Sequence, residues 1–237
     1  MRLSAYSAYL FDLDGVITPT AEVHMKAWAE MFNEYLAGRG DQPPWSDADY
    51  FAYVDGKPRY DGVRDFLASR GISLPEGSPD DDPGQQSVCG LGNRKNATFN
   101  HIIRRDGVAP FPGSKALIEA ILAAGAKLAV VSSSRNAVPV LRAAQLDEAF
   151  PVIVDGNVAD AQQLPGKPAP DTFVYAARQL GVQPAQAVVI EDALSGVAAG
   201  VTGGFGLVVG VDRGVGVEAL TQAGAQLVVK DLKELVN

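Results

Sequence analysis

Two patterns of hydrophobic and polar positions divide this chain. From Pro112 onward, short apolar runs alternate with segments of helical spacing, and the connections between them are short. This pattern is typical of βαβ units, which build a parallel sheet covered by helices on both faces. Ser114 is expected to cap the first helix of this part, which ends at Gly125. Further strands are expected at 127–131, 151–154, 187–190, 206–209 and 226–229, and further helices at 137–145, 171–180 and 194–200.

The preceding region is mostly helical. Val23, Ala27, Met31 and Tyr35 recur every four residues and predict a helix over 22–36 with one packed face. Two further helices are expected, around 63–67 and over 94–105, and the Pro- and Gly-rich stretch 75–92 between them is expected to be a long surface loop.

An apolar strand near the start of the chain runs directly into two carboxylates. Residues 9–16 read Tyr-Leu-Phe-Asp-Leu-Asp-Gly-Val. Side chains two apart on a strand share a face, so Asp12 and Asp14 are expected to point together beyond the carboxyl end of the strand, where open α/β sheets bind their ligands. Gly15 allows a sharp turn. An ordinary Asp-rich turn would have the same sequence, whereas an EF-hand loop fits poorly because valine and isoleucine stand where that loop needs an oxygen ligand and a glycine.

The helical region lies between this first strand and all the others. The economical interpretation is an α/β fold, a Rossmann-like doubly wound parallel sheet with an inserted α-helical cap domain. We expect residues 1–18 and 109–237 to form the core and residues 19–108 to form the cap. An insertion at this point would lie above Asp12 and Asp14, which suggests a lid.

Composition limits the classes of function. The chain has 237 residues, of which 47% are hydrophobic and 20% are charged, as in ordinary globular proteins. Its net charge of −8 argues against nucleic acid and anionic membrane as partners, because both need a basic surface. No apolar run approaches the roughly 20 residues of a membrane span, and the start of the chain does not have the pattern of a signal peptide. Cys89 is the only cysteine, so no intrachain disulfide is possible and a cytoplasmic location is expected.

Polar residues follow three later strands. Ser132 follows the second predicted strand, Lys167 lies beyond the third, and Glu191 and Asp192 follow the fourth. Taken singly, each has an ordinary explanation as a helix cap, a loop residue or an acidic helix start. The carboxyl ends of parallel strands meet at one edge, so together these residues supply the groups that phosphoryl transfer needs. A bound Mg²⁺, which prefers oxygen ligands, would offset the charge of the carboxylates.

These four segments together resemble the four motifs of the haloacid dehalogenase superfamily of phosphotransferases. The matching residues are Asp12-Leu13-Asp14-Gly15-Val16, Ser132, Lys167 and Glu191-Asp192. The resemblance implies that Asp12 is the nucleophile that forms an aspartyl phosphate and that Asp14 is the general acid and base. It also implies that Ser132 and Lys167 hold the transferred phosphoryl group. The implied Mg²⁺ ligands are Asp12, the main-chain carbonyl of Asp14, and Asp192, with Glu191 nearby.

Within that superfamily, the chain is similar to the β-phosphoglucomutase family over nearly its whole length. The likeness rests on His24 and on the segments 11–18, 20–22, 27–28, 94–96, 167–171 and 191–192. It implies a sugar phosphomutase that interconverts β-D-glucose 1-phosphate and glucose 6-phosphate through an aspartyl-phosphate enzyme and a bisphosphate intermediate. A small sugar phosphate is then the expected partner, and no protein partner is implied. The implied substrate and cap residues are Thr20, His24, Arg59, Lys95, Ser134 and Asn136.

Three of these residues bear on the choice between two activities. The resemblance places Arg59 and Lys95 at the non-transferring phosphate and His24 beside the acid and base, where it shapes cap closure. A lid that excludes water favours a mutase, whereas water at the aspartyl phosphate gives the alternative, a Mg²⁺-dependent phosphatase of a small sugar phosphate. A catalytically silent binding protein would have lost motif residues, and none is lost.

Other positions depart from the family pattern or match a different one. Pro19 replaces an acid, and Gly62 and Ala193 replace serines. The segment Gly214-Val215-Gly216 matches a dinucleotide-binding fingerprint only loosely, because too few residues follow it to complete a βαβ unit.

Overall fold

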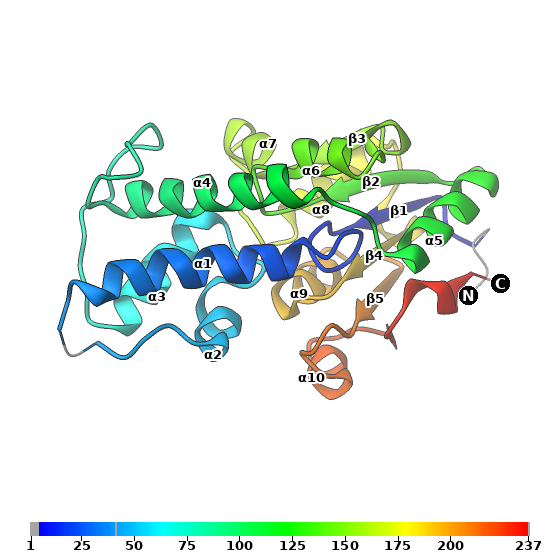
Figure 1. The fold of residues 1–237 in the computed structure, drawn as a ribbon. Helices are drawn as coiled ribbons and strands as arrows, with labels where there is room; N and C mark the ends of the chain where they lie inside the picture. The colour runs from blue at the N-terminus through cyan, green and yellow to red at the C-terminus, as the bar shows by residue number, and fades with distance from the viewer. Residues whose placement is uncertain (1–4, 41, 237) are drawn as a thin grey trace. The chain divides into compact units, whose positions relative to one another are not determined.

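The chain divides into two compact units. The computed structural model describes residues 5–40 and 42–236. One unit, called here the α/β unit, comprises Met1–Pro19 and Val108–Asn237, and the other, the helical unit, comprises Thr20–Gly107. The second unit therefore interrupts the first in sequence, directly after its first strand. Each is described by itself (Figure 1).

Among the described residues, the α/β unit contains one six-stranded sheet with the order β3-β2-β1-β4-β5-β6. All neighbouring strands are parallel, and β1 lies near the centre, where Leu10 is opposite Ala129 on one side and Val189 on the other. The strands are β1 (Ala8–Phe11), β2 (Lys127–Val131), β3 (Val152–Val154), β4 (Ala187–Glu191), β5 (Leu207–Val211) and β6 (Leu227–Val229). This confirms the predicted Rossmann-like α/β architecture.

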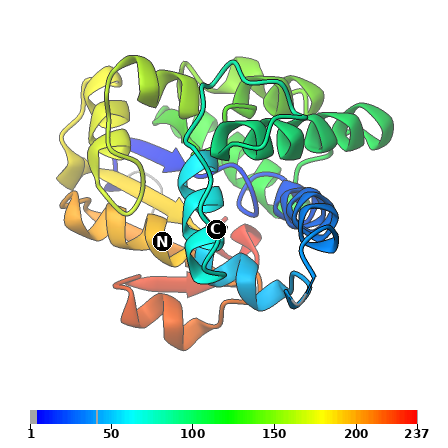
Figure 2. The ribbon, with the colours of Figure 1, turned by 90° about the vertical axis from the view of Figure 1, so that its left-hand side faces the viewer.

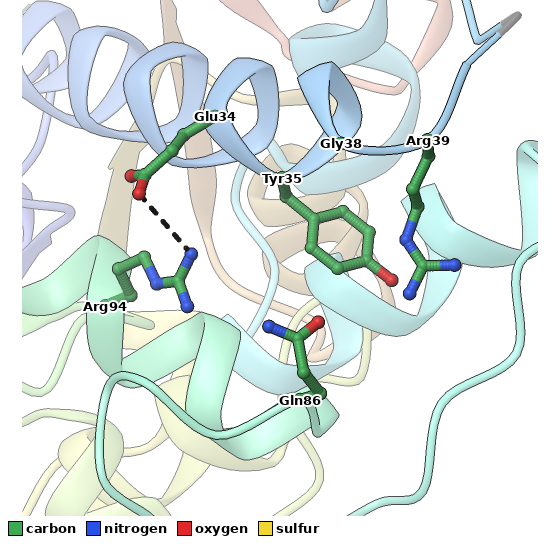
Figure 3. Close-up of a pocket in the computed structure, with 6 residues that line it drawn as sticks. All are labelled: Glu34, Tyr35, Gly38, Arg39, Gln86 and Arg94. Carbon is green, nitrogen blue, oxygen red and sulfur yellow. Dashed lines mark ion pairs between the residues drawn. The ribbon is translucent and has the colours of Figure 1, made fainter.

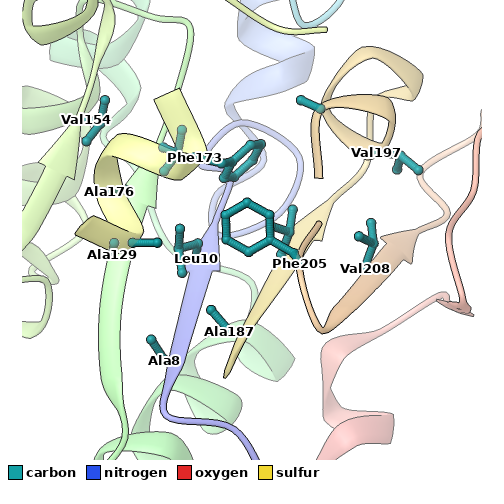
Figure 4. Packing of buried hydrophobic residues seen from close by; sticks show 14 of the residues in the cluster. Ala8, Leu10, Ala129, Val154, Phe173, Ala176, Ala187, Val197, Phe205 and Val208 are labelled. Atoms are coloured by element: carbon teal, nitrogen blue, oxygen red, sulfur yellow. The ribbon is translucent and has the colours of Figure 1, made fainter. Parts of the chain in front are cut away.

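The strands are buried on both faces, which is why they read as apolar runs rather than as alternating patterns. Ala8 and Leu10 of β1 pack with Phe173 and Phe205 on one face of the sheet (Figure 4). The intervening side chains point the other way, and Phe11 makes an edge-to-face contact with Phe150. Helices must therefore cover both faces, as the apolar runs predicted.

The helices of the α/β unit follow the strands in alternation. They are α5 (Pro112–Ala123), α6 (Ala137–Ala143), α7 (Gly156–Ala161), α8 (Asp171–Gln179), α9 (Leu194–Thr202) and α10 (Val217–Gln222), with short 3₁₀ turns at Asp147–Ala149, Pro184–Gln186 and Leu232–Leu235. In Figure 2, α10 lies beside β6 in the orange and red part of the chain. Helix α7 was not predicted from the sequence.

Ser114 does not have the predicted role of a helix cap. Helix α5 begins two residues earlier, with Pro112 at its first position, where the missing N–H of proline leaves no donor unsatisfied. The Ser114 hydroxyl instead donates a hydrogen bond of 2.7 Å to the carbonyl of Val16. It therefore ties α5 to the turn that follows β1.

The helical unit is built around an aromatic cluster. Its elements are α1 (Thr20–Ala37), α2 (Asp47–Asp49), a π-helical turn (Tyr50–Val54), α3 (Arg59–Ser69) and α4 (Val88–Asp106). The Phe32 ring is fully buried, with its centroid 5.3 Å from that of Trp28, 4.8 Å from that of Trp45 and 4.1 Å from that of Phe66. Because these rings come from α1, α3 and the segment between them, their packing holds the unit together.

Helix α4 begins earlier than the sequence predicted. The surface loop was expected to extend through Gly92, but the Ser87 side chain accepts a hydrogen bond from the N–H of Gly90 and starts the helix at Val88. Gly90 and Gly92 lie inside the helix, where close contacts leave no room for a side chain. A Cβ at Gly90 would lie 2.4 Å from the carbonyl oxygen of Gln85, and one at Gly92 would lie 2.8 Å from the Tyr60 ring. Glycine marks tertiary packing here rather than a loop.

Gly62 is explained by the same kind of contact. A Cβ at this position would lie 3.1 Å from a methyl group of Val54, which belongs to the π-helical turn. The side chain of a serine would have to displace that valine.

Among the described residues, no helix has both the length and the apolar character required to cross a membrane.

Replacing Phe32 with alanine should destabilise the helical unit by about 3–5 kcal/mol, because it removes a fully buried ring and leaves a cavity. The change is measured by urea unfolding followed by tryptophan fluorescence, since Trp28 and Trp45 are the only tryptophans and both contact Phe32. Phe51, which is 50% exposed in the same unit, provides the control, and Phe51→Ala should cost less than about 1 kcal/mol. Equal losses in the two variants would contradict the central role of the cluster.

Candidate active site

Four segments of the α/β unit bring polar groups to the carboxyl edge of its sheet. Asp12 follows β1, Ser132 follows β2, and Glu191 ends β4, so these side chains come from three adjacent strands. Lys167 comes from the loop between α7 and α8. The carboxyl ends of adjacent parallel strands lie at one edge, which is where open α/β sheets place their ligands.

Lys167 lies at the centre of this group. Its Nζ atom is 2.5 Å from Oδ1 of Asp12 and 2.6 Å from Oε1 of Glu191, and it donates a further hydrogen bond of 2.9 Å to the carbonyl of Val131. The ammonium also faces the Phe173 ring, with Nζ 5.0 Å from the ring centroid. The side chains of Lys167 and Glu191 are only 2% and 1% exposed, so these charges interact in surroundings that water screens little.

Burial and charge act in opposite directions on these groups. Burial raises the pKa of Asp12 well above its ordinary value, the Lys167 ammonium lowers it, and the neighbouring Glu191 and Asp14 carboxylates raise it again. Burial alone would lower the pKa of Lys167, but the Asp12 and Glu191 carboxylates raise it above its ordinary value. Lys167 is therefore held as a cation, beside carboxyl groups that outnumber it.

Glu191 is fixed by the chain that follows it. Its Oε2 atom accepts hydrogen bonds from the backbone N–H groups of Asp192, at 3.0 Å, and Ala193, at 3.1 Å. A Cβ at Gly196, in the first turn of α9, would lie 1.8 Å from its other oxygen. Gly196 is thus required by the site, and no sequence signal distinguished it from an ordinary helical glycine.

Three carboxylates form a possible metal site. Asp12, Glu191 and Asp192 each offer an oxygen atom, and these atoms all lie within 4.8 Å of one another. Gly15 keeps the space open, because a Cβ there would lie 1.9 Å from Oδ2 of Asp192. An all-oxygen set around an excess of negative charge fits a hard divalent cation such as Mg²⁺. The Asp14 side chain does not belong to this set of three.

The loop after β2 is folded by its own serines. The Ser132 hydroxyl is 3.4 Å from Oδ2 of Asp14 and accepts a hydrogen bond of 3.1 Å from the N–H of Ser134. The Ser134 hydroxyl accepts one of 3.1 Å from the N–H of Asn136. Ser134 and Asn136 were predicted as substrate residues, and the hydrogen bonds of Ser134 shape the loop that carries Ser132.

Arg213 is a residue of this edge that the sequence did not reveal. Its Nε atom donates a hydrogen bond of 2.8 Å to the carbonyl of Gly15, and its guanidinium lies 3.9 Å from the centroid of the Phe111 ring. Gly15 has a φ of +87°, a left-handed conformation that glycine adopts readily. Arg213 therefore holds the turn that carries Asp14.

The glycines after Arg213 close a loop rather than bind a dinucleotide. The N–H groups of Gly214 and Gly216 each donate a 3.0 Å hydrogen bond to Oδ1 of Asp212, which keeps the pKa of Asp212 below its ordinary value. These hydrogen bonds close the loop that carries Arg213, so the loose fingerprint has a structural explanation.

The helical unit contains a second group of predicted residues. His24 of α1 contacts the Lys95 ammonium of α4 through its Nδ1 atom, and its ring stacks on Phe99 with centroids 4.1 Å apart. Lys95 is 3% exposed, with Nζ 5.0 Å from the Trp28 ring centroid. Two residues predicted separately from the sequence therefore form one buried contact.

Arg59 is oriented by the same helix. Its guanidinium donates hydrogen bonds to Oδ1 of Asn96, at 2.9 Å, and Oδ1 of Asn93, at 3.3 Å. Thr20 is buried at the first position of α1, one helical turn before His24. Of the two predicted phosphate ligands in the helical unit, Lys95 is therefore buried on α4 and Arg59 is partly exposed and bonded to α4.

Comparisons with known proteins agree with this architecture. A family model described as haloacid dehalogenase-like hydrolase matches residues 6–204. The beta-phosphoglucomutase of Mycobacterium bovis is 51% identical over 238 residues, which cover 97% of this chain and 91% of the relative.

Two solved structures extend the comparison to the fold. The beta-phosphoglucomutase of Clostridium difficile superimposes with a TM-score of 0.79 at 24% identity, covering 97% of this chain and 93% of that one. CbbY of Rhodobacter sphaeroides, in complex with xylulose-(1,5)bisphosphate, gives 0.76 at 25% identity and covers 97% and 96% of the two chains. Both units of the chain are included in these matches.

Replacing Lys167 with methionine should reduce the free energy of unfolding by about 3–5 kcal/mol at neutral pH, because it leaves two buried carboxylates without their cation. The folded variant would then bind more protons than the unfolded chain, so the deficit should shrink as the pH falls from about 8 to about 5. Urea unfolding followed by circular dichroism, with a chelator present, measures both effects. Lys115→Met, at an exposed position of α5, is the control, and a pH-independent deficit would contradict the charge argument.

Proposed function

The chain belongs to the haloacid dehalogenase-like hydrolase family, and from this premise we propose that it is a Mg²⁺-dependent sugar phosphomutase. It interconverts β-D-glucose 1-phosphate and glucose 6-phosphate through an aspartyl-phosphate enzyme and a bisphosphate intermediate. The observation that carries this proposal is the identity of half the aligned positions with a beta-phosphoglucomutase over 97% of the chain. The match covers the helical unit as well as the α/β unit.

Asp12 is the proposed nucleophile. One of its oxygens attacks phosphorus while the bond from phosphorus to the sugar oxygen breaks, which leaves an aspartyl phosphate and a free hydroxyl. The 2.5 Å contact from Lys167 to Oδ1 supports this role, because it fixes the carboxylate and leaves Oδ2 for the attack. The Lys167 ammonium and the Ser132 hydroxyl would then bind the oxygens of the transferred group.

The metal would be held by the carboxylates described above. Asp12 and Asp192 would supply side-chain oxygens and Asp14 its main-chain carbonyl, with Glu191 beside them. A bound Mg²⁺ would neutralise charge on the phosphoryl group and on Asp12. The oxygen-only donor set supports this choice of ion.

Asp14 is the proposed general acid and base. It would donate a proton to the leaving sugar oxygen and later accept one from the hydroxyl that attacks the aspartyl phosphate. The hydrogen bond from Arg213 to the carbonyl of Gly15 supports the role, since it fixes the backbone next to this side chain. Such positioning matters because small displacements of a reacting group cost large factors in rate.

A mutase must return the phosphoryl group to sugar rather than to water. Arg59 and Lys95 are the proposed ligands of the non-transferring phosphate, with Thr20, His24, Ser134 and Asn136 completing the substrate site. The orientation of Arg59 by two asparagines supports its part, because a guanidinium held in place loses little entropy on binding phosphate. Phosphatase activity is less favoured. The partner is then a small sugar phosphate, and a cytoplasmic location fits such a substrate and the single cysteine.

The product ratio tests the proposed activity. With β-glucose 1-phosphate and a trace of the bisphosphate, glucose 6-phosphate should form at least about ten times faster than free phosphate, a difference of about 1.4 kcal/mol between the two barriers. The two products are followed separately by a coupled assay and by phosphate release. Dominant release of phosphate would make the protein a phosphatase.

Asp14→Asn should lower turnover by about 10²–10⁴-fold, because it removes proton transfer without changing the shape of the side chain. Mg²⁺-dependent binding of inorganic phosphate, measured by calorimetry, should remain, since Asp12, Ser132 and Lys167 are intact. Glu119→Gln, at an exposed carboxylate of α5, should leave both quantities unchanged. Unchanged turnover in the Asp14 variant would remove this residue from the mechanism.

A further inference from the structure

The helical unit contains a cavity of about 380 Å³ at the carboxyl end of α1 (Figure 3). It shares no residue with the candidate active site. Arg94, which lines the cavity, is followed on α4 by Lys95, which contacts His24. Because consecutive helical side chains point about 100° apart, Arg94 and Lys95 point to different sides of α4. The lining residues are Glu34, Tyr35, Gly38, Arg39, Gln86 and Arg94.

Two guanidinium groups face this cavity (Figure 3). Arg94 is anchored through Nε, which donates a hydrogen bond of 2.9 Å to the carbonyl of Pro83, and its terminal nitrogens remain available. Its contact with Glu34 is loose, at 3.9 Å. Arg39 lies over the Tyr35 ring, 4.5 Å from the centroid, and has no ion pair in the described part of the chain. The cavity therefore has two cations and one carboxylate.

Tyr35 adds a buried donor. The residue is 6% exposed, and no group among residues 5–40 and 42–236 accepts a hydrogen bond from its hydroxyl. Burial raises the pKa of Tyr35, while the charge of Arg39 and its guanidinium's approach to the hydroxyl oxygen oppose part of that rise, so the hydroxyl keeps its proton and can donate it to an acceptor. A buried donor without an acceptor costs free energy unless a ligand or water satisfies it.

We propose that this cavity is a second binding site, which takes a small hydroxylated phosphate ester, such as a sugar phosphate, apart from the catalytic centre. The Arg39 and Arg94 guanidiniums would bind the phosphate oxygens, for which their planar donor geometry is suited. The Tyr35 hydroxyl and the Gln86 amide would donate to the same group. Glu34 would accept a hydrogen bond from a sugar hydroxyl, which explains why a carboxylate lines a site that also binds a phosphate.

The proposed binding site can be tested independently of the proposed reaction, because ligand binding is measured directly rather than through turnover. If the protein proves to be a phosphatase, the cavity and its charges are unchanged. If the cavity binds no ester, the catalytic proposal is equally unaffected. A ligand bound at this position would contact α1 and α4, the two helices that carry His24 and Lys95.

The test is a titration of ¹⁵N-labelled protein with glucose 6-phosphate, followed through the Nε–Hε resonances of the arginines, which single variants assign. The resonances of Arg39 and Arg94 should shift together with one dissociation constant. Arg39→Gln, which removes a cation at an exposed position, should weaken binding at this site by about tenfold or more. Tyr35→Phe keeps the buried ring and should also weaken it, by about fivefold to tenfold.

Arg104→Gln is the matched control, because Arg104 is an exposed arginine of α4 outside the cavity. It should leave the titration of Arg39 and Arg94 unchanged. A parallel titration with inorganic phosphate separates the two sources of the anion. Binding of phosphate as tightly as of glucose 6-phosphate would overturn the assignment of a sugar ester, and the absence of shifts at millimolar ligand, or equal weakening by the control, would overturn the site itself.

Discussion

The buried contact of Lys167 with two carboxylates is the constraint on which the α/β unit depends. Each of these charges loses most of its hydration on folding, at a cost of several kcal/mol per ion. The cost is offset only when the ammonium lies within about 3 Å of both carboxylates, as it does here at 2.5 and 2.6 Å. That distance requires β1 and β4 to be neighbours and the loop before α8 to return to their carboxyl ends. The same buried contact therefore depends both on the strand order and on the polar residues at the carboxyl edge of the sheet.

One ammonium does not balance the carboxylates of this edge. Asp12, Glu191 and Asp192 converge within 4.8 Å, and close like charges repel unless a cation joins them. The surrounding backbone is arranged to keep that space open: Gly15 and Gly196 stand where any Cβ would overlap a carboxylate, and two N–H groups hold one oxygen of Glu191. In an acidic site of this kind a divalent cation makes a phosphorylated substrate favourable, since it offsets the negative charge that the phosphate would otherwise face.

The core of the helical unit is packed in a different way. Its described residues form no sheet, and a hydrophobic cluster that includes the aromatic rings around Phe32 packs at its core. The same aromatic surface surrounds the Lys95 ammonium, which lies about 5 Å from the centroids of Trp28 and Phe99 and contacts His24. A cation held by π-faces and an imidazole is already partly desolvated. Binding a phosphate there would cost less than at an exposed lysine, which connects the packing of this unit to the activity proposed for it.

The sequence by itself determined the local elements and the chemistry of the edge. Apolar runs of four or five residues fixed the strands, and the carboxylates, serine and lysine that follow them fixed which side chains would meet, because parallel strands end at one edge. It did not determine what depends on contacts between distant segments. Arg213 reaches the carbonyl of Gly15 across 198 positions of sequence, Ser114 bonds Val16 instead of capping α5, and Gly90 and Gly92 lie within α4 although such residues usually end helices. These outcomes follow from close approach of backbones and side chains in three dimensions, for which a linear pattern carries no signal.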